Sequence, residues 1–175
     1  MANGLTIIDQ QFESGNTLLT YLKENNQITF HSEAENNFRK SLLLSSASFF
    51  EKEISGLVIE FAKFSTDNDE RIVTLIKQKA VSRQYHTYFD WESNNANKFF
   101  AMFGETFKGI MVNKIKENED FSNSIKAFLE IGNERNKMVH QNFAEIVIDK
   151  TADEIYKLYK SSLVFIATIR QELIK

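Results

Sequence analysis

The longest regular pattern of apolar residues lies in the first half of the chain, over residues 32–64. No residue in this range interrupts a helix, and the apolar side chains recur at spacings of three and four positions. These side chains are Leu43, Ala47, Phe50, Ile54, Leu57, Val58 and Phe61. Because this spacing gathers them on one face, the pattern predicts one long amphipathic helix.

Shorter patterns of the same kind predict helices before and after this one. Four of these shorter helices are predicted at residues 10–24, 67–79, 93–103 and 105–117. We expect Ser93 to cap the third of them and Gly104 to end it. Residues 82–91 are rich in aromatic side chains and carry no clear period, so this stretch is not assigned to an element.

Two longer helices are predicted in the C-terminal third. Asp120 is the expected cap of the first, which gathers Ile125, Phe128, Leu129, Val139 and Phe143 on one side. The second opens with Thr151-Ala152-Asp153-Glu154, the pattern of a capping box. It continues with Ile155, Leu158, Tyr159, Ile166, Ile169 and Leu173.

The composition agrees with a helical fold. The 175 residues include no Pro and only six Gly, whereas sandwiches and barrels depend on these residues for their many turns. We therefore predict an all-α fold, an antiparallel bundle of four to five core helices. No linker, repeat or charge block divides the chain, so residues 1–175 are expected to form one domain, with 1–30 as an N-terminal helical extension and 32–174 as the core bundle.

The composition excludes cysteine chemistry and restricts the kinds of partner that the protein can bind. The chain has no Cys, which excludes disulfides, thiolate metal sites and thiol nucleophiles. The formal net charge of −3 means that any contact with RNA or DNA must be local rather than spread over the surface. The N-terminus lacks the features of a signal peptide and no run is long enough to cross a bilayer, so a cytoplasmic protein without membrane contact is expected.

One predicted helix breaks its own pattern. On a wheel of about 100° per residue, with Ile125 as origin, the buried stripe is defined by Phe128, Leu129, Gly132 and Val139. Asn136 then lies near the centre of this stripe, with His140 at one edge and Arg135 near the other. Buried polar groups cost stability unless they are satisfied, and such inconsistencies are enriched at functional sites.

Two interpretations of these three side chains remain open at this point. They satisfy one another inside the core, or the stripe opens onto a cleft that receives a polar ligand. Arg offers a permanently charged fork suited to phosphate, His moves protons at neutral pH, and Asn supplies a donor and an acceptor. These are the parts needed for phosphodiester transesterification without a metal or other cofactor.

The string Arg135-Asn136-Lys137-Met138-Val139-His140 resembles the R-N-x-x-x-H signature of the HEPN superfamily, small helical domains that include many endoribonucleases. Residues 42–51, which end at Glu51, are similar to the first core helix of that superfamily. Residues 95–104 resemble the N-x-N...L-F...G element of the branch called RiboL-PSP HEPN. The three matches occur in the expected order and span residues 32 to 170.

The resemblance implies a homodimer in which the two signatures face each other across a shared cleft, and a metal-independent endoribonuclease that acts there. His140 would assist proton transfer at the ribose 2′-hydroxyl or the leaving 5′-oxygen. Arg135 would neutralise the phosphate in the transition state, and Asn136 would orient His140 or the substrate. Products would carry 2′,3′-cyclic phosphate ends.

Further residues are assigned supporting parts. The resemblance implies that Glu51 holds Arg135 or His140 in place, although a solvated glutamate fits the sequence as well. Lys137, Lys108 and Lys114 would contact RNA from a basic rim, although scattered lysines are more often solvated. His31 and His86 occur in no metal-binding spacing and are expected to be structural or surface residues.

The biological role implied is a growth-inhibiting toxin or an antiviral effector, controlled by an antitoxin or another regulatory protein. No ATPase, Schlafen-like or CRISPR-type module is fused to these residues, so control is expected to come from a separate chain, a ligand or the dimer equilibrium. The alternative is a catalytically silent HEPN dimer that binds RNA, a nucleotide or a partner protein.

Overall fold

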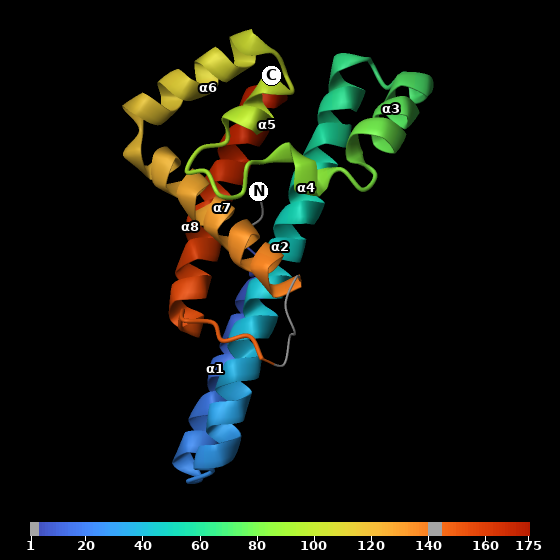
Figure 1. Ribbon diagram of the computed structural model, residues 1–175. Helices are drawn as coiled ribbons and strands as arrows, with labels where there is room; N and C mark the ends of the chain where they lie inside the picture. Colours follow the sequence, from blue (N-terminus) through green and yellow to red (C-terminus); the bar gives the residue numbers. More distant parts are fainter. Residues whose placement is uncertain (1–3, 140–144) are drawn as a thin grey trace.

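The computed structural model describes residues 4–139 and 145–175, and in these residues it contains eight α-helices and one short π-helical stretch (Figure 1). The helices are α1 (Ile7–Glu24), α2 (Ile28–Ser65), α3 (Glu70–Ile76), α4 (Tyr85–Tyr88), α5 (Asn97–Ala101), α6 (Glu105–Glu117), α7 (Glu119–Val139) and α8 (Ala152–Leu173), and the stretch η1 (Lys77–Val81) follows α3. No strand occurs in the described part of the chain. The all-α fold predicted from the sequence is confirmed.

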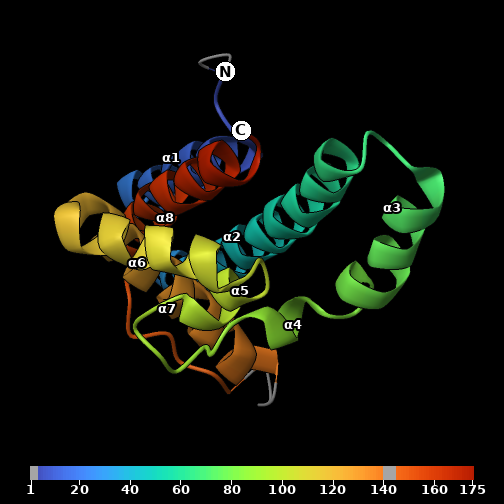
Figure 2. The same ribbon diagram turned by 90° about the horizontal axis from the view of Figure 1, so that it is seen from above.

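Helices α2, α7 and α8 pack against one another and form the centre of the bundle. α1 runs back along the first half of α2, so that the two helices form a hairpin that extends from the rest of the bundle (Figure 1). α6 crosses over α7 at the opposite end of the molecule, and α3 stands apart on the far side of α2 (Figure 2). The short helix α4 leads the chain back from α3 towards α7.

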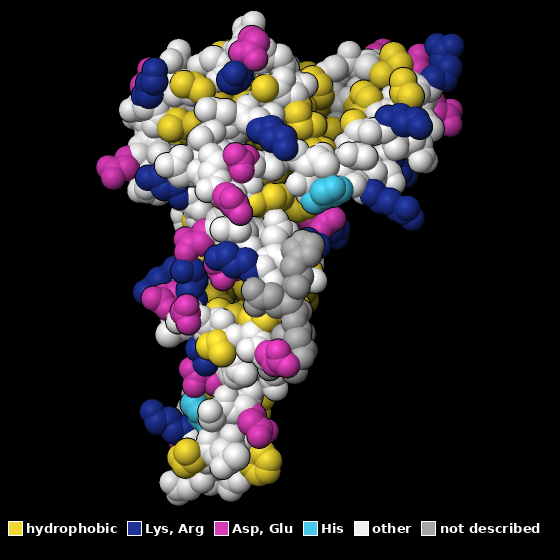
Figure 3. All heavy atoms as spheres, viewed as in Figure 1, with side chains coloured by type: hydrophobic (Ala, Val, Ile, Leu, Met, Phe, Trp, Pro, Cys, Tyr) yellow, Lys and Arg dark blue, Asp and Glu magenta, His cyan; other side chains and the backbone are white. Residues whose placement is uncertain are grey.

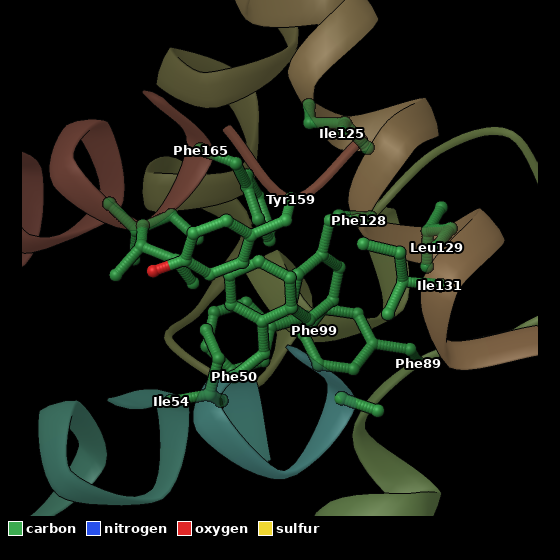
Figure 4. Close-up of a cluster of buried hydrophobic side chains, with 14 of the residues drawn as sticks. Phe50, Ile54, Phe89, Phe99, Ile125, Phe128, Leu129, Ile131, Tyr159 and Phe165 are labelled. Carbon is green, nitrogen blue, oxygen red and sulfur yellow. The ribbon is translucent and has the colours of Figure 1, made fainter. Parts of the chain in front are cut away.

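A cluster of aromatic rings fills the space between these helices (Figure 4). Phe128 of α7 lies in its middle, with its ring centroid 5.4 Å from that of Phe50 and 4.8 Å from that of Phe165. Phe89, from the segment after α4, packs 4.9 Å from Phe128. All four side chains are buried, so the aromatic run that has no period in the sequence contributes directly to the core.

A buried carboxylate joins the start of α1 to α8. Asp9, which is 3% exposed, accepts hydrogen bonds from the Thr6 backbone N–H at 2.8 Å, the Tyr156 hydroxyl at 2.8 Å and the Lys160 ammonium at 3.2 Å. Burial by itself would raise the pKa of Asp9, but these hydrogen bonds outweigh it and lower the pKa to about 2. The carboxylate is therefore charged and fully satisfied, and it fixes α1 to the bundle.

Local side-chain chemistry sets most of the helix ends. The predicted capping box at α8 is confirmed, because Thr151 Oγ1 accepts from the Glu154 N–H at 3.2 Å and Glu154 Oε2 accepts from the Thr151 N–H at 2.8 Å. The helix expected over residues 67–79 begins later, at Glu70, since Asp67 and Asn68 adopt positive φ values of 48° and 61°.

Two predicted caps are wrong. Ser93 accepts hydrogen bonds from Asn95 within the loop, and Asn95 Oδ1 in turn accepts from the Asn97 N–H at the start of α5. At α7 the side chain that accepts from the Phe121 N–H is Asn118, at 2.9 Å, two residues before Asp120. In both cases the side-chain oxygen of an Asn close to the helix end accepts the backbone N–H, because Asn, Asp and Ser are all favoured at helix N-termini.

No helix in residues 4–139 and 145–175 is both long enough and apolar enough to span a membrane.

Candidate functional site

One face of the last turns of α7 borders a cleft, while Met138 on the same turns stays in the core. Phe128, Leu129 and Gly132 are buried as predicted, but Val139 is 53% exposed, which contradicts its place on the buried stripe. Asn136, expected near the centre of the stripe, is only half-buried. The prediction assumed that α7 stays covered to its end, whereas on this face the cover gives way to the cleft after Gly132.

This cleft has a volume of about 420 Å³. Its lining residues come from three separate parts of the chain, namely α2, the segment that contains α4, and the end of α7. They are Glu51, Arg83, Tyr85, His86, Arg135, Asn136 and Val139. Of the two interpretations left open by the sequence, the arrangement of Arg135 and Asn136 agrees with the one in which the stripe opens onto a cleft.

Two contacts hold the guanidinium of Arg135 in the cleft. Its Nη1 donates to the Asn136 side-chain oxygen at 3.2 Å, and its Nη2 lies 3.9 Å from Glu51 Oε2. The side chains of Arg135 and Glu51 are 36% and 47% exposed, so their ion pair is screened by solvent and is weak. Arg135 is therefore oriented, yet it keeps N–H groups with which to bind a ligand.

Tyr85 forms the apolar side of the cleft and also lines a small cavity behind it with Trp91 and Gly132. Burial raises the pKa of the Tyr85 phenol, and the negative charge of Glu51 raises it further, while Arg135 has the opposite effect. Tyr85 is accordingly a neutral hydrogen-bonding group at neutral pH. It is a donor beside two charged side chains.

Sequence reasoning missed the contribution of residues 83–86 to this site. Arg83, Tyr85 and His86 all line the cleft, although His86 was expected to be a structural or surface residue. His86 is indeed exposed, but its exposure is towards the cleft that holds Arg135. Arg83 adopts a positive φ of 60°, a conformation that a long side chain takes only at some energetic cost and that is enriched at functional sites. This backbone feature has no signal in the sequence.

The permanently charged groups of the cleft are two guanidiniums, and one carboxylate lies beside them. Arg135 and Arg83 supply two permanent positive charges, and guanidinium groups bind phosphate through paired hydrogen bonds. In the described residues, no three His, Asp or Glu side chains come close enough together to hold a metal ion. Glu51 is the carboxylate among the lining residues, and it faces Arg135.

A protein-family model, described as RiboL-PSP-HEPN, matches residues 12–175. The chain belongs to the RiboL-PSP-HEPN family. The match includes α2, the segment that contains α4, and α7, and hence every element that lines the cleft. Searches of curated proteins and of solved structures gave no match.

Residues 95–104, the second stretch that resembles this HEPN family, contribute to the fold. Asn95 orders the loop before α5, Phe99 and Phe100 are fully buried, and Gly104 adopts a φ of 96° between α5 and α6. The side-chain oxygen of Asn97 is buried and has no hydrogen-bond partner in the described part of the chain. None of these residues lines the cleft, so the stretch builds the scaffold rather than the site.

The predicted lysine contacts lie elsewhere. Lys108 and Lys114 are on α6, where Lys108 pairs with Glu105 at 3.2 Å and Lys114 with Glu172 at 2.8 Å.

Lys137 is on α7 next to Asn136, but its ammonium is 2.7 Å from Glu134 and it does not line the cleft. Basic and acidic side chains are interspersed on the face shown in Figure 3, in agreement with local rather than general attraction of phosphates. RNA contact by these lysines stays a prediction.

The remaining predicted catalytic residue, His140, lies outside the residues that the structure describes. The predicted support from Glu51 is consistent with its position beside Arg135.

Proposed function

We propose that this HEPN protein is an endoribonuclease that cleaves RNA by attack of a ribose 2′-hydroxyl on the adjacent phosphate. The observation that carries the proposal is the position of Arg135 and Asn136, which share a cleft with Glu51 at the end of α7 in a member of this family. A guanidinium that is oriented on one side and free on the other suits a phosphate that gains negative charge.

The reaction needs three contributions. The oxygen of the 2′-hydroxyl forms a bond to phosphorus while the bond from phosphorus to the 5′-oxygen breaks, which leaves a 2′,3′-cyclic phosphate and a 5′-hydroxyl end. Arg135 binds the non-bridging oxygens as their charge grows, and Asn136 orients the guanidinium through its hydrogen bond of 3.2 Å. His140 takes the proton of the 2′-hydroxyl, a role assigned from the sequence signature. The permanent charge of Arg135 allows this chemistry to proceed without a divalent cation.

We place the reaction at the interface of a homodimer. The cleft is open on one side, and Val139 at its border is an apolar side chain that is 53% exposed. A second copy packed on this border would cover Val139 and bring two sets of Arg135 and Asn136 together. RNA would then bind between the two copies, with phosphate contacts from both.

The test is incubation of the purified protein with mixed cellular RNA in excess EDTA. We expect the parent protein to produce fragments with cyclic phosphate ends, and Arg135→Ala to lower the rate by about 100-fold or more. His140→Ala should lower it to a similar extent. Arg71→Ala is the matched control, because Arg71 is an exposed arginine on α3 that pairs with Asp69 away from the cleft. Size-exclusion chromatography with light scattering measures the dimer.

Each result has a defined meaning. Cleavage by the parent and by Arg71→Ala, but not by the cleft variants, supports the proposal. If the folded parent protein binds RNA or a nucleotide but does not cleave any RNA, the protein is a catalytically silent binding module and not a nuclease. If the Arg135→Ala variant cleaves at the parental rate, the site is not at this cleft.

A nuclease of this kind would damage cellular RNA when it is unrestrained. We therefore propose a role as a growth-inhibiting toxin or an antiviral effector that a separate regulatory protein controls. Expression of the parent chain and of Arg135→Ala in bacterial cells tests this role. Growth arrest by the parent alone is the expected result.

A further inference from the structure

A second proton-transfer group faces the same cleft from a different segment. His86, in the short helix α4, lines both the cleft and the small cavity behind it, together with Arg135 and Asn136. The residue is exposed, and the cleft is one of the surfaces that it lines. An imidazole beside a phosphate-binding guanidinium can give or take a proton at neutral pH.

The position of His86 is set by contacts that reach α7. The Trp91 indole N–H donates to the backbone carbonyl of His86 at 2.9 Å. The same indole lies against α7 at Gly132, where a Cβ atom would be only 2.1 Å from Trp91 Cζ3 and 2.3 Å from Cε3. Only a residue without a side chain allows this approach, so Gly132 makes room for Trp91, and Trp91 holds the backbone carbonyl of His86.

Gly132 lies three and four residues before Arg135 and Asn136, so all three occupy one side of α7 within about one turn. The contact through Trp91 therefore joins His86 to the same turn of helix that carries the phosphate-binding groups. Packing of Trp91 against Tyr85, at a centroid distance of 5.4 Å, and against Phe128, at 6.0 Å, restricts the indole further.

We propose that His86 is a catalytic residue of this cleft that protonates the leaving 5′-oxygen. This inference rests on the proposed ribonuclease function. Transesterification moves two protons, one from the attacking 2′-hydroxyl and one to the leaving oxygen. The first goes to His140, and the second comes from the imidazolium of His86 as the bond from phosphorus to the 5′-oxygen breaks. Arg135 holds the phosphate during both proton transfers.

The test uses two RNA substrates that differ in one atom of the cleaved linkage. In the first the bridging 5′-atom is oxygen, and in the second it is sulfur, which leaves as a thiolate and does not need a proton because thiols are far more acidic than alcohols. We expect His86→Gln to cleave the oxygen substrate about 100-fold more slowly than the parent. The sulfur substrate should be cleaved at close to the parental rate.

Two further variants complete the experiment. His140→Ala should be slow on both substrates, because loss of the base affects the attack itself. His31→Gln is the matched control, since His31 lies in α2 beside Glu35 and outside the cleft, and it should cleave both substrates as the parent does. Circular dichroism and thermal unfolding confirm that each variant is folded.

The outcomes separate this inference from the proposed function. If the parent cleaves the oxygen substrate and His86→Gln cleaves it equally well, the role of His86 is wrong while the ribonuclease stands. If His86→Gln is equally slow on both substrates, His86 is not the proton donor. If the parent cleaves neither substrate and no cellular RNA, the proposed function fails and the role of His86 fails with it.

Discussion

Two polar clusters in this protein are built on opposite plans. Around Asp9, three donors from α8 and from the cap residue of α1 bind one carboxylate whose side chain is only 4% exposed. Around Arg135, the partners are one amide at 3.2 Å and one carboxylate at 3.9 Å, and the guanidinium is 36% exposed. A cluster that is buried and fully satisfied stabilises the fold, whereas one that is open and only partly satisfied is available to a ligand.

The largest expected effect concerns the Asp9 cluster. Asp9→Ala removes a buried carboxylate that accepts three hydrogen bonds and supplies one half of the capping box of α1, so the free energy of unfolding should fall by about 3 kcal/mol. Urea unfolding followed by circular dichroism measures it. Turnover per folded molecule should be unchanged, since the cluster lies outside the cleft.

Asp153→Ala is the control for this variant, because Asp153 is an acidic residue in the first turn of α8 that is exposed. It should change the free energy of unfolding by less than about 0.5 kcal/mol. The contrast between the clusters would break down if Asp9→Ala abolished turnover in the folded protein, or if Arg135→Ala destabilised the protein as strongly as Asp9→Ala does.

The second effect is a dependence of the free energy of unfolding on pH in the acidic range. The pKa of Asp9 is lowered from 3.8 to about 2 in the folded protein, so its contribution is fully present above pH 3.8 and is lost as the pH falls towards 2. The shift corresponds to about 2 kcal/mol. In urea unfolding between pH 5 and pH 2, Asp9→Asn should lose less stability than the parent by about this amount. Parallel curves for the two proteins would contradict the assignment.

How far the sequence predicts each region follows from the range of the contacts involved. The long helix over 32–64 was predicted because periodicity is a local signal, and the structure extends it only to Ile28–Ser65. Arg135 and Asn136 were predicted because they interrupt such a period. Arg83 and His86 were not predicted as cleft residues, because α4 is a single turn and carries no hydrophobic period. The cleft that they line together with the end of α7 also joins residues about fifty positions apart in the sequence.

The exposure of Val139 also depends on contacts that a local pattern does not contain. A helical wheel gives the angle of Val139 but not the point at which neighbouring elements stop covering the helix, and Val139 is exposed for that reason. A signal for the missed segment was present in the pairing of the single Trp in the chain with a Gly in mid-helix. This pairing can be recognised only when the contact between Trp91 and Gly132 is known.

A third prediction concerns that contact. Gly132→Ala places a methyl group where the Trp91 ring lies, so the indole and the His86 carbonyl bonded to it must shift. We expect cleavage of the oxygen-linked RNA substrate to fall by about 10-fold, a smaller loss than removal of the imidazole itself. The sulfur-linked substrate should be affected much less, a difference that simple destabilisation would not produce.

Gly56→Ala is the matched control, because a Cβ at Gly56, also in a helix, meets no atom within 4 Å. This substitution should stabilise the protein by about 0.5 to 1 kcal/mol and leave both cleavage rates unchanged. Equal losses of Gly132→Ala on both substrates would mean that Gly132 serves the fold alone, and the proposed route from α7 to His86 would then be wrong.

The smallest expected effect is that of Glu51, and it tests how loosely the open cluster is held. The long, solvent-screened pair with Arg135 is worth less than about 1 kcal/mol, so Glu51→Gln should lower the cleavage rate only about 3- to 5-fold. Added salt should reduce the difference from the parent. Glu53→Gln, whose carboxylate pairs with Arg170 at 3.3 Å, is the control and should have no effect. A loss as large as that of Arg135→Ala would show instead that the Glu51 carboxylate acts on the substrate itself, and the cluster would then hold two reacting groups rather than one group and its support.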